Sequence, residues 1–286
     1  MNLFYLFKNF FVQKKIFYVQ NQQDFEESLE KLKSNNILAV DTEFIWRNTY
    51  FPKLSLIQIS TENIIYIFDC ISLDVLKLRD IFENKNIKKI FHSVRGDASV
   101  IYNCLGFKIV NVHDTQIAED VLNNNFEKQI SYKNLVRRYF LKELSKSETN
   151  SNWEKRPLES AQLKYAAEDV RYLHSITKIQ TKNLLRSKKF EFFQSCCDKE
   201  KNFGEENFSE SRLRRLKKKN KNISEIEIKI FNWREKEAQN LDVPPSHIFE
   251  DRDLKKLKKI LEMKNFNEYR WIIKKETSRN SFQNDF

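Results

Sequence analysis

The sequence predicts an α/β fold in which a mixed sheet is flanked by helices and is followed by a small all-helical domain. Three apolar segments joined by short links, at residues 36–41, 53–60 and 63–68, indicate consecutive strands of an antiparallel meander. Strand-like and helix-like segments then alternate up to residue 114, after which the pattern stays helical. A strongly charged stretch separates this part from a second helical pattern near the C-terminus.

The remaining elements follow from periodicity and from capping residues. Asp74 is placed to cap a helix that runs to about residue 84, and Gly96 begins another helix after a short strand. The apolar start of the chain is broken by Lys8 and is shorter than the roughly 18 residues of a membrane span, so we expect an edge strand or a surface extension there. Further elements are expected as a helix at 24–33, strands at 88–92 and 108–114, and the longest helix at about 159–185.

Length and composition indicate a folded protein with an affinity for polyanions. The chain has 286 residues, of which 40% are hydrophobic and 13% aromatic, enough for a large domain with a buried core plus a small one. Its formal net charge is +11, which favours nucleic acid as a partner. The alternative is a compositional bias, because Asn, Lys, Ile and Phe are abundant and there are only three glycines.

The four cysteines show no Cys-x-x-Cys pair and no disulfide framework, and no signal peptide precedes them. They stand at positions 70, 104, 196 and 197. We therefore expect a reduced, cytoplasmic protein that is not bound to a membrane.

Asp41 and Glu43 are the first candidate site residues. They stand two apart at the end of a predicted strand, so both carboxylates project from the same side. Taken alone the pattern is weak, because Asp-x-Glu is common by chance and an acid at this point can simply cap the next helix.

Four further candidate positions have equally plain structural explanations when each is taken alone. Tyr165 and Asp169 are one turn apart on one face of a predicted helix, which also describes a core tyrosine with an exposed acid. Asp97 stands at a helix start, where N-terminal capping accounts for it, and His92 fits a buried core histidine.

The four acids together predict a different role. Carboxylates are hard oxygen ligands that suit Mg²⁺ or Mn²⁺, and four of them can hold two such ions about 3.5–4 Å apart for phosphodiester displacement. A phenol beside a metal-bound water can orient it or help to take its proton. The set of Asp41, Glu43, Asp97, Tyr165 and Asp169 therefore points to a nuclease.

Six short motifs occur in the order and context of the DnaQ-like 3′→5′ exonucleases, and the chain most closely resembles ribonuclease D over about residues 16–179. The histidine subclass of that family carries His five residues before the last acid, but Lys stands at position 164, so the tyrosine subclass is the match. The motifs are Asp41–Phe44, Tyr50–Gln58, His92–Asp97, His113–Gln116, then Lys146–Glu148 with Trp153 and Arg156–Leu158, and Tyr165–Asp169.

This resemblance implies a ribonuclease H-like mixed sheet of five strands and a two-metal mechanism. Asp41, Glu43 and Asp169 are expected to bind one Mg²⁺ or Mn²⁺ ion, and Asp41 with Asp97 the second. Tyr165 is expected to position the attacking water, and 5′-mononucleotides are released from a 3′ end. Substrate contacts are expected from Phe44, Tyr50 and His92. For the aromatics near Asp41 and Glu43, core packing is an equally good explanation.

The C-terminal segment resembles the HRDC module that follows the exonuclease domain in this family. Trp233–Ala238, Leu241–Phe249 and Asp253–Leu254 carry the likeness. Family members often have two such modules and this chain has room for one, which implies weaker processivity. We divide the chain into an N-terminal extension (1–15), an exonuclease domain (16–187), a charged linker or helix (188–222) and an HRDC-like helical domain (223–286).

The expected substrate is RNA with a single-stranded 3′ end, and the resemblance implies trimming of tRNA precursors by a monomer. The basic run from Arg212 to Lys221 is placed to follow a phosphate backbone, although a solvated charged linker fits the same residues. Two alternatives remain open from the sequence. One is a 3′→5′ exonuclease that acts on DNA, and the other is a catalytically silent RNA-binding protein.

Overall fold

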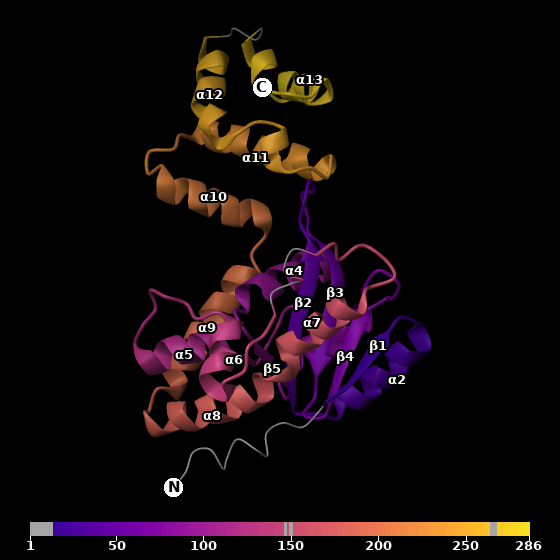
Figure 1. Cartoon of the computed structure of the whole chain (residues 1–286). Helices are drawn as coiled ribbons and strands as arrows, with labels where there is room; N and C mark the ends of the chain where they lie inside the picture. The colour runs from indigo at the N-terminus through magenta and orange to yellow at the C-terminus, as the bar shows by residue number, and fades with distance from the viewer. Residues whose placement is uncertain (1–13, 146–147, 149–150, 264–267) are drawn as a thin grey trace. The chain divides into compact units, whose positions relative to one another are not determined.

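A six-stranded mixed sheet forms the centre of the N-terminal part of the chain (Figure 1). The computed structural model describes residues 14–145, 148, 151–263 and 268–286, and these divide into two compact units. Most of the expected N-terminal extension and part of the Lys146–Glu148 motif lie outside the described residues. The first unit holds the described residues up to Ile45 and from Lys53 to Glu205, and the second holds Trp46–Pro52 and Glu206–Phe286.

The strand order in the sheet is β1-β4-β3-β2-β5-β6. The expected meander is present, since β2, β3 and β4 pair antiparallel, whereas β1 pairs parallel with β4, and β5 pairs parallel with both β2 and β6. The strands are β1 (Lys15–Val19), β2 (Ile37–Ile45), β3 (Lys53–Ser60), β4 (Ile64–Asp69), β5 (Lys88–Phe91) and β6 (Val112–Asp114).

The expectation of five strands was wrong, because β1 adds a sixth at the edge beside β4. The first three residues of β1 are exposed, and only Val19 at its end is fully buried. Its sequence therefore lacks the alternation of apolar and polar residues that marks a half-buried strand. The strand expected at 108–114 is also shorter, because the amides of Ile109 and Val110 donate to Glu205 and to the carbonyl of Phe82 and not to a neighbouring strand.

Helices cover both faces of the sheet. One face, with Val40, Ile57 and Phe68, packs into a core with α2, α3, α4 and α9. The opposite face, with Ala39 and Leu56, is covered by α7, which lies across β2, β3 and β4 (Figure 1). The helices of this unit are α2 (Gln22–Lys33), α3 (Arg79–Phe82), α4 (Arg95–Leu105), α5 (Thr115–Asn123), α6 (Tyr132–Phe140), α7 (Ser160–Arg171), α8 (Leu173–Arg186) and α9 (Phe190–Gly204), with a 3₁₀ turn at Leu76–Leu78.

The single long helix expected at about 159–185 is broken into α7 and α8 at Tyr172. The Tyr132 hydroxyl donates to the carbonyl of Glu168 at 3.0 Å and accepts from the amide of Tyr172 at 3.2 Å. It therefore stands between the two groups that an uninterrupted helix would pair, which is a known cause of helix kinks. The helix expected at 74–84 is likewise reduced to a 3₁₀ turn and α3. Its N-cap is Val75 and not Asp74, although the Asp74 carboxylate accepts a hydrogen bond from the amide of Leu76.

An ion pair holds the loop before α7 against the sheet. Arg156 donates from Nε and Nη2 to the two oxygens of Asp69 in β4 at 2.6 and 2.7 Å, and Tyr18 in β1 donates to the same carboxylate. The loop is further joined to β3, since the Ser55 hydroxyl donates to the carbonyl of Trp153. These contacts fix the start of α7, which a capping box between Glu159 and Gln162 then completes.

The second unit is helical and includes the tip of the β2–β3 hairpin. The Tyr50 ring is buried in its core under the Arg212 guanidinium, and the Tyr50 hydroxyl donates to Glu235 at 3.0 Å. Arg212 also donates to Glu235, at 2.6 Å. Its helices are α10 (Phe208–Lys219), α11 (Glu225–Asn240), α12 (Leu254–Glu262) and α13 (Glu276–Asp285), with 3₁₀ turns at Pro245–His247, Asp251–Asp253 and Glu268–Trp271. None of the helices in the described ranges has the length and apolarity to cross a membrane.

Replacing Arg156 with Met should destabilise the first unit by about 3 kcal/mol, because the Asp69 carboxylate, only 2% exposed, loses its cation. The Lys155→Met variant is the control, since Lys155 pairs with Glu159 in a pair exposed on both sides and worth about 0.3–0.5 kcal/mol. Urea unfolding followed by circular dichroism compares the two. Equal losses would show that the Arg156 pair does not hold the loop.

Candidate active site

Strand β2 presents the first two acids to the sheet face under α7. Asp41 and Glu43 share this face with Ala39, and Thr42 between them points the other way. The strand was expected to end at Asp41 but continues to Ile45, because β3 pairs with it along this whole stretch. The pairing register shifts between Glu43 and Phe44, a bulge of the kind that re-aims side chains beside active sites.

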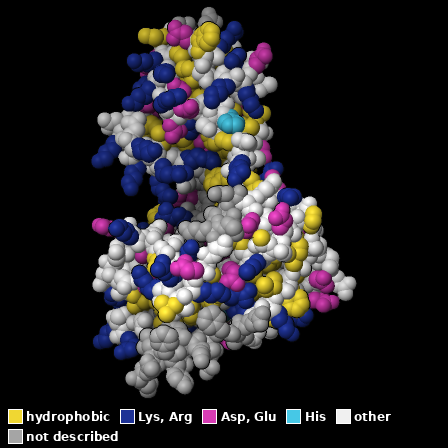
Figure 2. Space-filling view, in the orientation of Figure 1, with side chains coloured by type: hydrophobic (Ala, Val, Ile, Leu, Met, Phe, Trp, Pro, Cys, Tyr) yellow, Lys and Arg dark blue, Asp and Glu magenta, His cyan; other side chains and the backbone are white. Residues whose placement is uncertain are grey.

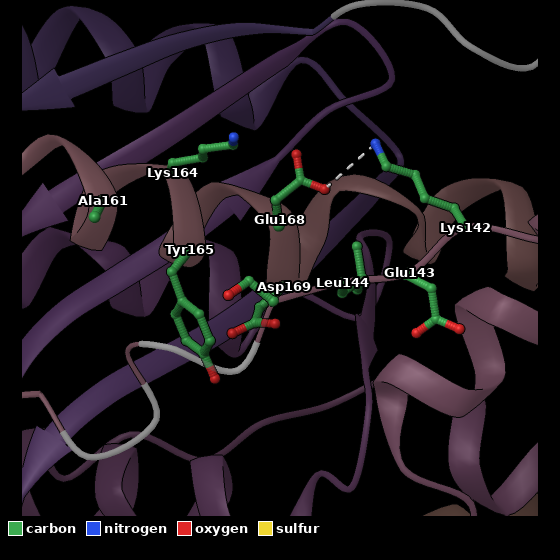
Figure 3. Close-up of a pocket in the computed structure, with 9 residues that line it drawn as sticks. Lys142, Glu143, Leu144, Ala161, Lys164, Tyr165, Glu168 and Asp169 are labelled. Carbon is green, nitrogen blue, oxygen red and sulfur yellow. Dashed lines mark ion pairs between the residues drawn. The ribbon is translucent and has the colours of Figure 1, made fainter.

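Helix α7 carries the second pair of candidate residues. Tyr165 and Asp169 point to the same side of the helix, one turn apart, as Figure 3 shows. The Tyr165 hydroxyl is hydrogen-bonded to the Asp169 carboxylate, and the ring packs against Trp153 with centroids 6.1 Å apart. The phenol is therefore held in place by the same loop that Arg156 anchors.

Three of the predicted acids meet at one point. One carboxylate oxygen from each of Asp41, Glu43 and Asp169 lies within 4.8 Å of the others. Asp97, buried in the first turn of α4, is not one of these three, but its charge adds to burial in raising the pKa of Asp41 and Glu43. Its carboxylate accepts a hydrogen bond at 2.7 Å from the hydroxyl of Thr42, which leaves the opposite side of β2. The four acids, which stand 128 positions apart at their extremes in the sequence, are thus held around β2.

The electrostatics of this cluster favour a bound cation. Burial is the main cause that raises the pKa of each of the four carboxyls above its ordinary value, and repulsion from neighbouring carboxylates adds to it. A divalent ion removes this repulsion, and carboxylate oxygens are the ligands that Mg²⁺ and Mn²⁺ prefer. The donor set therefore fits divalent metal ions.

The three residues expected to contact substrate lie in different surroundings. Phe44 follows the cluster on β2 and is partly exposed. Both ring nitrogens of His92 have partners, the Thr115 hydroxyl at 3.0 Å and the carbonyl of Ile130 at 3.1 Å, and burial lowers the His92 pKa to about 4, so the ring is neutral and braces the α6 entry loop. Tyr50 is 1% exposed in the core of the second unit, so core packing, and not base stacking, describes it.

A pocket of about 390 Å³ opens beside Tyr165 and Asp169. Lys142 and Glu168 face each other across it at 3.9 Å, and Glu168 also accepts from Arg171 at 2.7 Å (Figure 3). The pocket is lined by Lys142, Glu143, Leu144, Ser145, Ala161, Lys164, Tyr165, Glu168 and Asp169.

Sequence reasoning missed the residues that hold the acids in place. Thr42 is the clearest case, because it stands between two candidate ligands and its hydroxyl reaches a third across 55 positions. Arg156 lies within the Arg156–Leu158 motif, but its partner Asp69 stands 87 positions away, and no local pattern joins the two. No sequence pattern distinguishes Lys142 from the many other lysines of this chain.

The sequence profile of the 3′-5′ exonuclease family matches residues 16–185. The chain belongs to the 3′-5′ exonuclease family. The matched range contains Asp41, Glu43, Asp97, Tyr165 and Asp169. It therefore constitutes a ribonuclease D-like exonuclease domain, on a mixed α/β sheet flanked by helices.

Curated relatives of this exonuclease chain include ribonucleases D from two bacteria. The protein of Bartonella henselae is 32% identical over 237 residues, which cover 81% of this chain and 58% of the relative. That of Desulfotalea psychrophila is 31% identical over 244 residues, covering 82% of this chain and 64% of the relative. The chain thus spans about three fifths of the length of these relatives.

Solved exonuclease structures share the fold. Escherichia coli RNase D, described as an exoribonuclease involved in structured RNA processing, superposes with a TM-score of 0.76 at 24% identity, covering 84% of this chain and 65% of that one. The catalytic core of RRP6 from Trypanosoma brucei gives 0.63 at 24% identity, covering 85% and 70%. Brucella melitensis NrnC with bound Mg²⁺ gives 0.57 at 23% identity, covering 67% and 92%.

Metal binding to the acidic cluster should depend on pH in a defined direction. Since the pKa values of the clustered carboxyls are raised on folding, the metal-free fold is favoured in acid and loses this contribution as the pH rises through the raised values. Mg²⁺ needs the ionised carboxylates and relieves their repulsion. Its increment in melting temperature should therefore be larger near pH 8 than near pH 5.5, by a few degrees.

The Asp41→Asn variant separates this effect from general charge effects. It should melt at a higher temperature than the parent in metal-free buffer near pH 8, because one buried repulsive charge is gone, and it should show little Mg²⁺ increment. Asp198→Asn, an exposed change on α9, should leave both values unchanged. A parent protein with the same Mg²⁺ increment at both pH values would contradict a carboxylate metal site.

Proposed function

We propose that this protein is a metal-dependent 3′→5′ exoribonuclease of the tyrosine subclass that releases 5′-mononucleotides from RNA. The observation that carries the proposal is the meeting of Asp41, Glu43 and Asp169 within 4.8 Å, beside the phenol of Tyr165. A cluster of buried acids has little structural use, because each added carboxylate raises the cost of folding at neutral pH.

The residues divide between two ions in this proposal. Asp41, Glu43 and Asp169 bind one ion, and Asp41 with Asp97 binds the second. Divalent ions held by these residues would activate a water as the nucleophile and would stabilise the leaving 3′ oxygen. The hydrogen bond from Thr42 holds the Asp97 carboxylate close to β2. In this proposal it thereby keeps Asp97 within reach of the ion that Asp41 also binds.

Tyr165 positions the attacking water in this scheme. Its hydroxyl is fixed by Asp169 and its ring by Trp153, and it borders the pocket. A donor held in this way orders a water for in-line attack at little entropic cost when the substrate binds.

RNA with a single-stranded 3′ end is the proposed substrate, and tRNA precursors are the proposed physiological class. The printed names of the relatives support RNA, and the net charge of +11 supports a polyanion. Lys and Arg side chains gather over α10 and α12 in the view of Figure 2. On these helices the apolar side is buried, and the exposed side carries Arg215, Lys217, Lys218, Lys219, Lys255, Lys256 and Lys259.

We also propose that the second unit is an HRDC domain that adds electrostatic grip on RNA, in a protein that acts as a monomer. Two basic pairs within this unit are structural and not available to phosphate, since Arg212 binds Glu235 and Arg214 binds Glu206. The lysines at the end of α10 carry the proposed contact.

Incubation with 5′-labelled RNA and Mg²⁺ or Mn²⁺ should give stepwise shortening from the 3′ end. The ladder should vanish with chelator and fall to background in Asp41→Ala, whose melting temperature is measured alongside to show that it folds. A DNA oligomer of the same sequence should be degraded more slowly. Binding without cleavage under every metal condition would reject the exonuclease, and faster DNA cleavage would reject the RNA assignment.

Replacing Tyr165 with Phe should lower kcat about 10²-fold with little change in KM, because the lost hydroxyl acts on the water and not on substrate binding. The control is Tyr139→Phe, which removes a hydroxyl bonded to Glu119 at 2.9 Å and should affect stability alone. Single-turnover assays on RNA measure the chemical step directly. A KM effect without a kcat effect would assign Tyr165 to substrate binding.

A further inference from the structure

Gln58 lies directly opposite Asp41 in the antiparallel pair of β2 and β3. Side chains at opposed positions leave the same face of the sheet, with Cβ atoms about 5 Å apart. This is the face that α7 covers, and its other members around Gln58 are apolar, among them Ala39, Leu56 and Ile67. An amide thus stands in an apolar layer beside the first ligand of the proposed metal site.

The Gln58 amide lacks the partners that buried amides normally have. Its side chain is 0% exposed, and neither Nε2 nor Oε1 has a hydrogen-bond partner among the described residues. Gln180 is equally buried, but its Nε2 donates to the Thr115 carbonyl at 2.9 Å and to Glu119 at 3.1 Å. Since an apolar side chain would fill this place at lower cost, an unpaired amide calls for an explanation.

Asp41 is the acceptor that the sheet geometry offers. On β4 the residue opposite Gln58 is Ile67, which has no polar atom in its side chain, and on β2 it is Asp41. A carboxylate has more lone pairs than one metal ion takes, so Asp41 can accept a hydrogen bond from Gln58 and still serve as a ligand. An amide N–H beside an ionised carboxylate stabilises it and fixes its orientation, as is usual for groups behind metal ligands.

We propose that Gln58 is a positioning residue for the metal site, and that its Nε2 donates a hydrogen bond to the Asp41 carboxylate when the acidic cluster binds divalent cations. This inference rests on the proposed metal-dependent function. The amide has no partner in the metal-free fold and gains one with the ion, so part of its burial cost is recovered only in the loaded protein. Gln58 therefore favours the metal-bound state without touching the ion.

The test compares metal affinity with metal-free stability in the full-length chain. Gln58→Met keeps the side-chain length and removes the amide. We expect its Mn²⁺ affinity, measured by titration calorimetry, to fall about 10- to 100-fold. We expect its melting temperature in chelator to stay equal or to rise, because no satisfied hydrogen bond is lost.

Gln180→Met is the matched control, because the same chemical change at an equally buried glutamine removes its hydrogen bonds to the Thr115 carbonyl, Glu119 and His113. It should melt at a lower temperature and keep the parent's Mn²⁺ affinity. Gln58→Leu is measured in parallel, so that a folding defect particular to Met does not decide the result. Parent-like Mn²⁺ affinity in a folded Gln58 variant would overturn the positioning role alone. A parent protein that binds no Mn²⁺ would overturn the metal site itself.

Discussion

The crowding of buried carboxylates is the constraint on which the rest of this structure depends. Asp41, Glu43 and Asp169 bring oxygens within 4.8 Å of one another, and burial and repulsion raise the pKa of each. Such a group is not held together by its own interactions. The packing of the sheet, α4 and α7 brings these acids together, and protonation or a bound cation relieves their repulsion. Marginally stable proteins retain arrangements of this kind at functional sites, where the stored cost is returned on binding.

The acids are held close together by contacts that lie outside the cluster. Arg156 binds Asp69 and so fixes the loop that leads into α7, while Thr42 turns Asp97 toward β2. The hydroxyl of Tyr132 interrupts the backbone ladder at the end of α7, so that α8 can start in a new direction. Each contact joins segments far apart in sequence. Together they position α7 so that Asp169 lies next to Asp41 and Glu43 of β2.

The sequence predicted the acids better than their supports, for a physical reason. Asp41, Glu43 and the Tyr165–Asp169 pair follow local periodicities of two and four residues, and the β2–β4 meander follows from apolar runs and short links. The edge strand β1, the break at Tyr172 and the Asp69 partner of Arg156 depend on neighbours dozens of residues away. No local sequence pattern contains those neighbours. The burial of Tyr50 against a helix 185 positions away could not be predicted for the same reason.

The charge of the acidic cluster is opposite to the net charge of the chain. The chain as a whole carries a net charge of +11, yet its candidate active site is a cluster of carboxylates. Such a cluster repels a phosphate backbone. Cations bound there would reverse the local field and make the site attractive to the same polyanion that the basic helices are proposed to hold. On the proposed function, metal and RNA must then strengthen each other's binding, and by linkage the effect is equal in both directions. On the same proposal, the acids that raise the cost of folding also repel RNA from this site until the metal is bound.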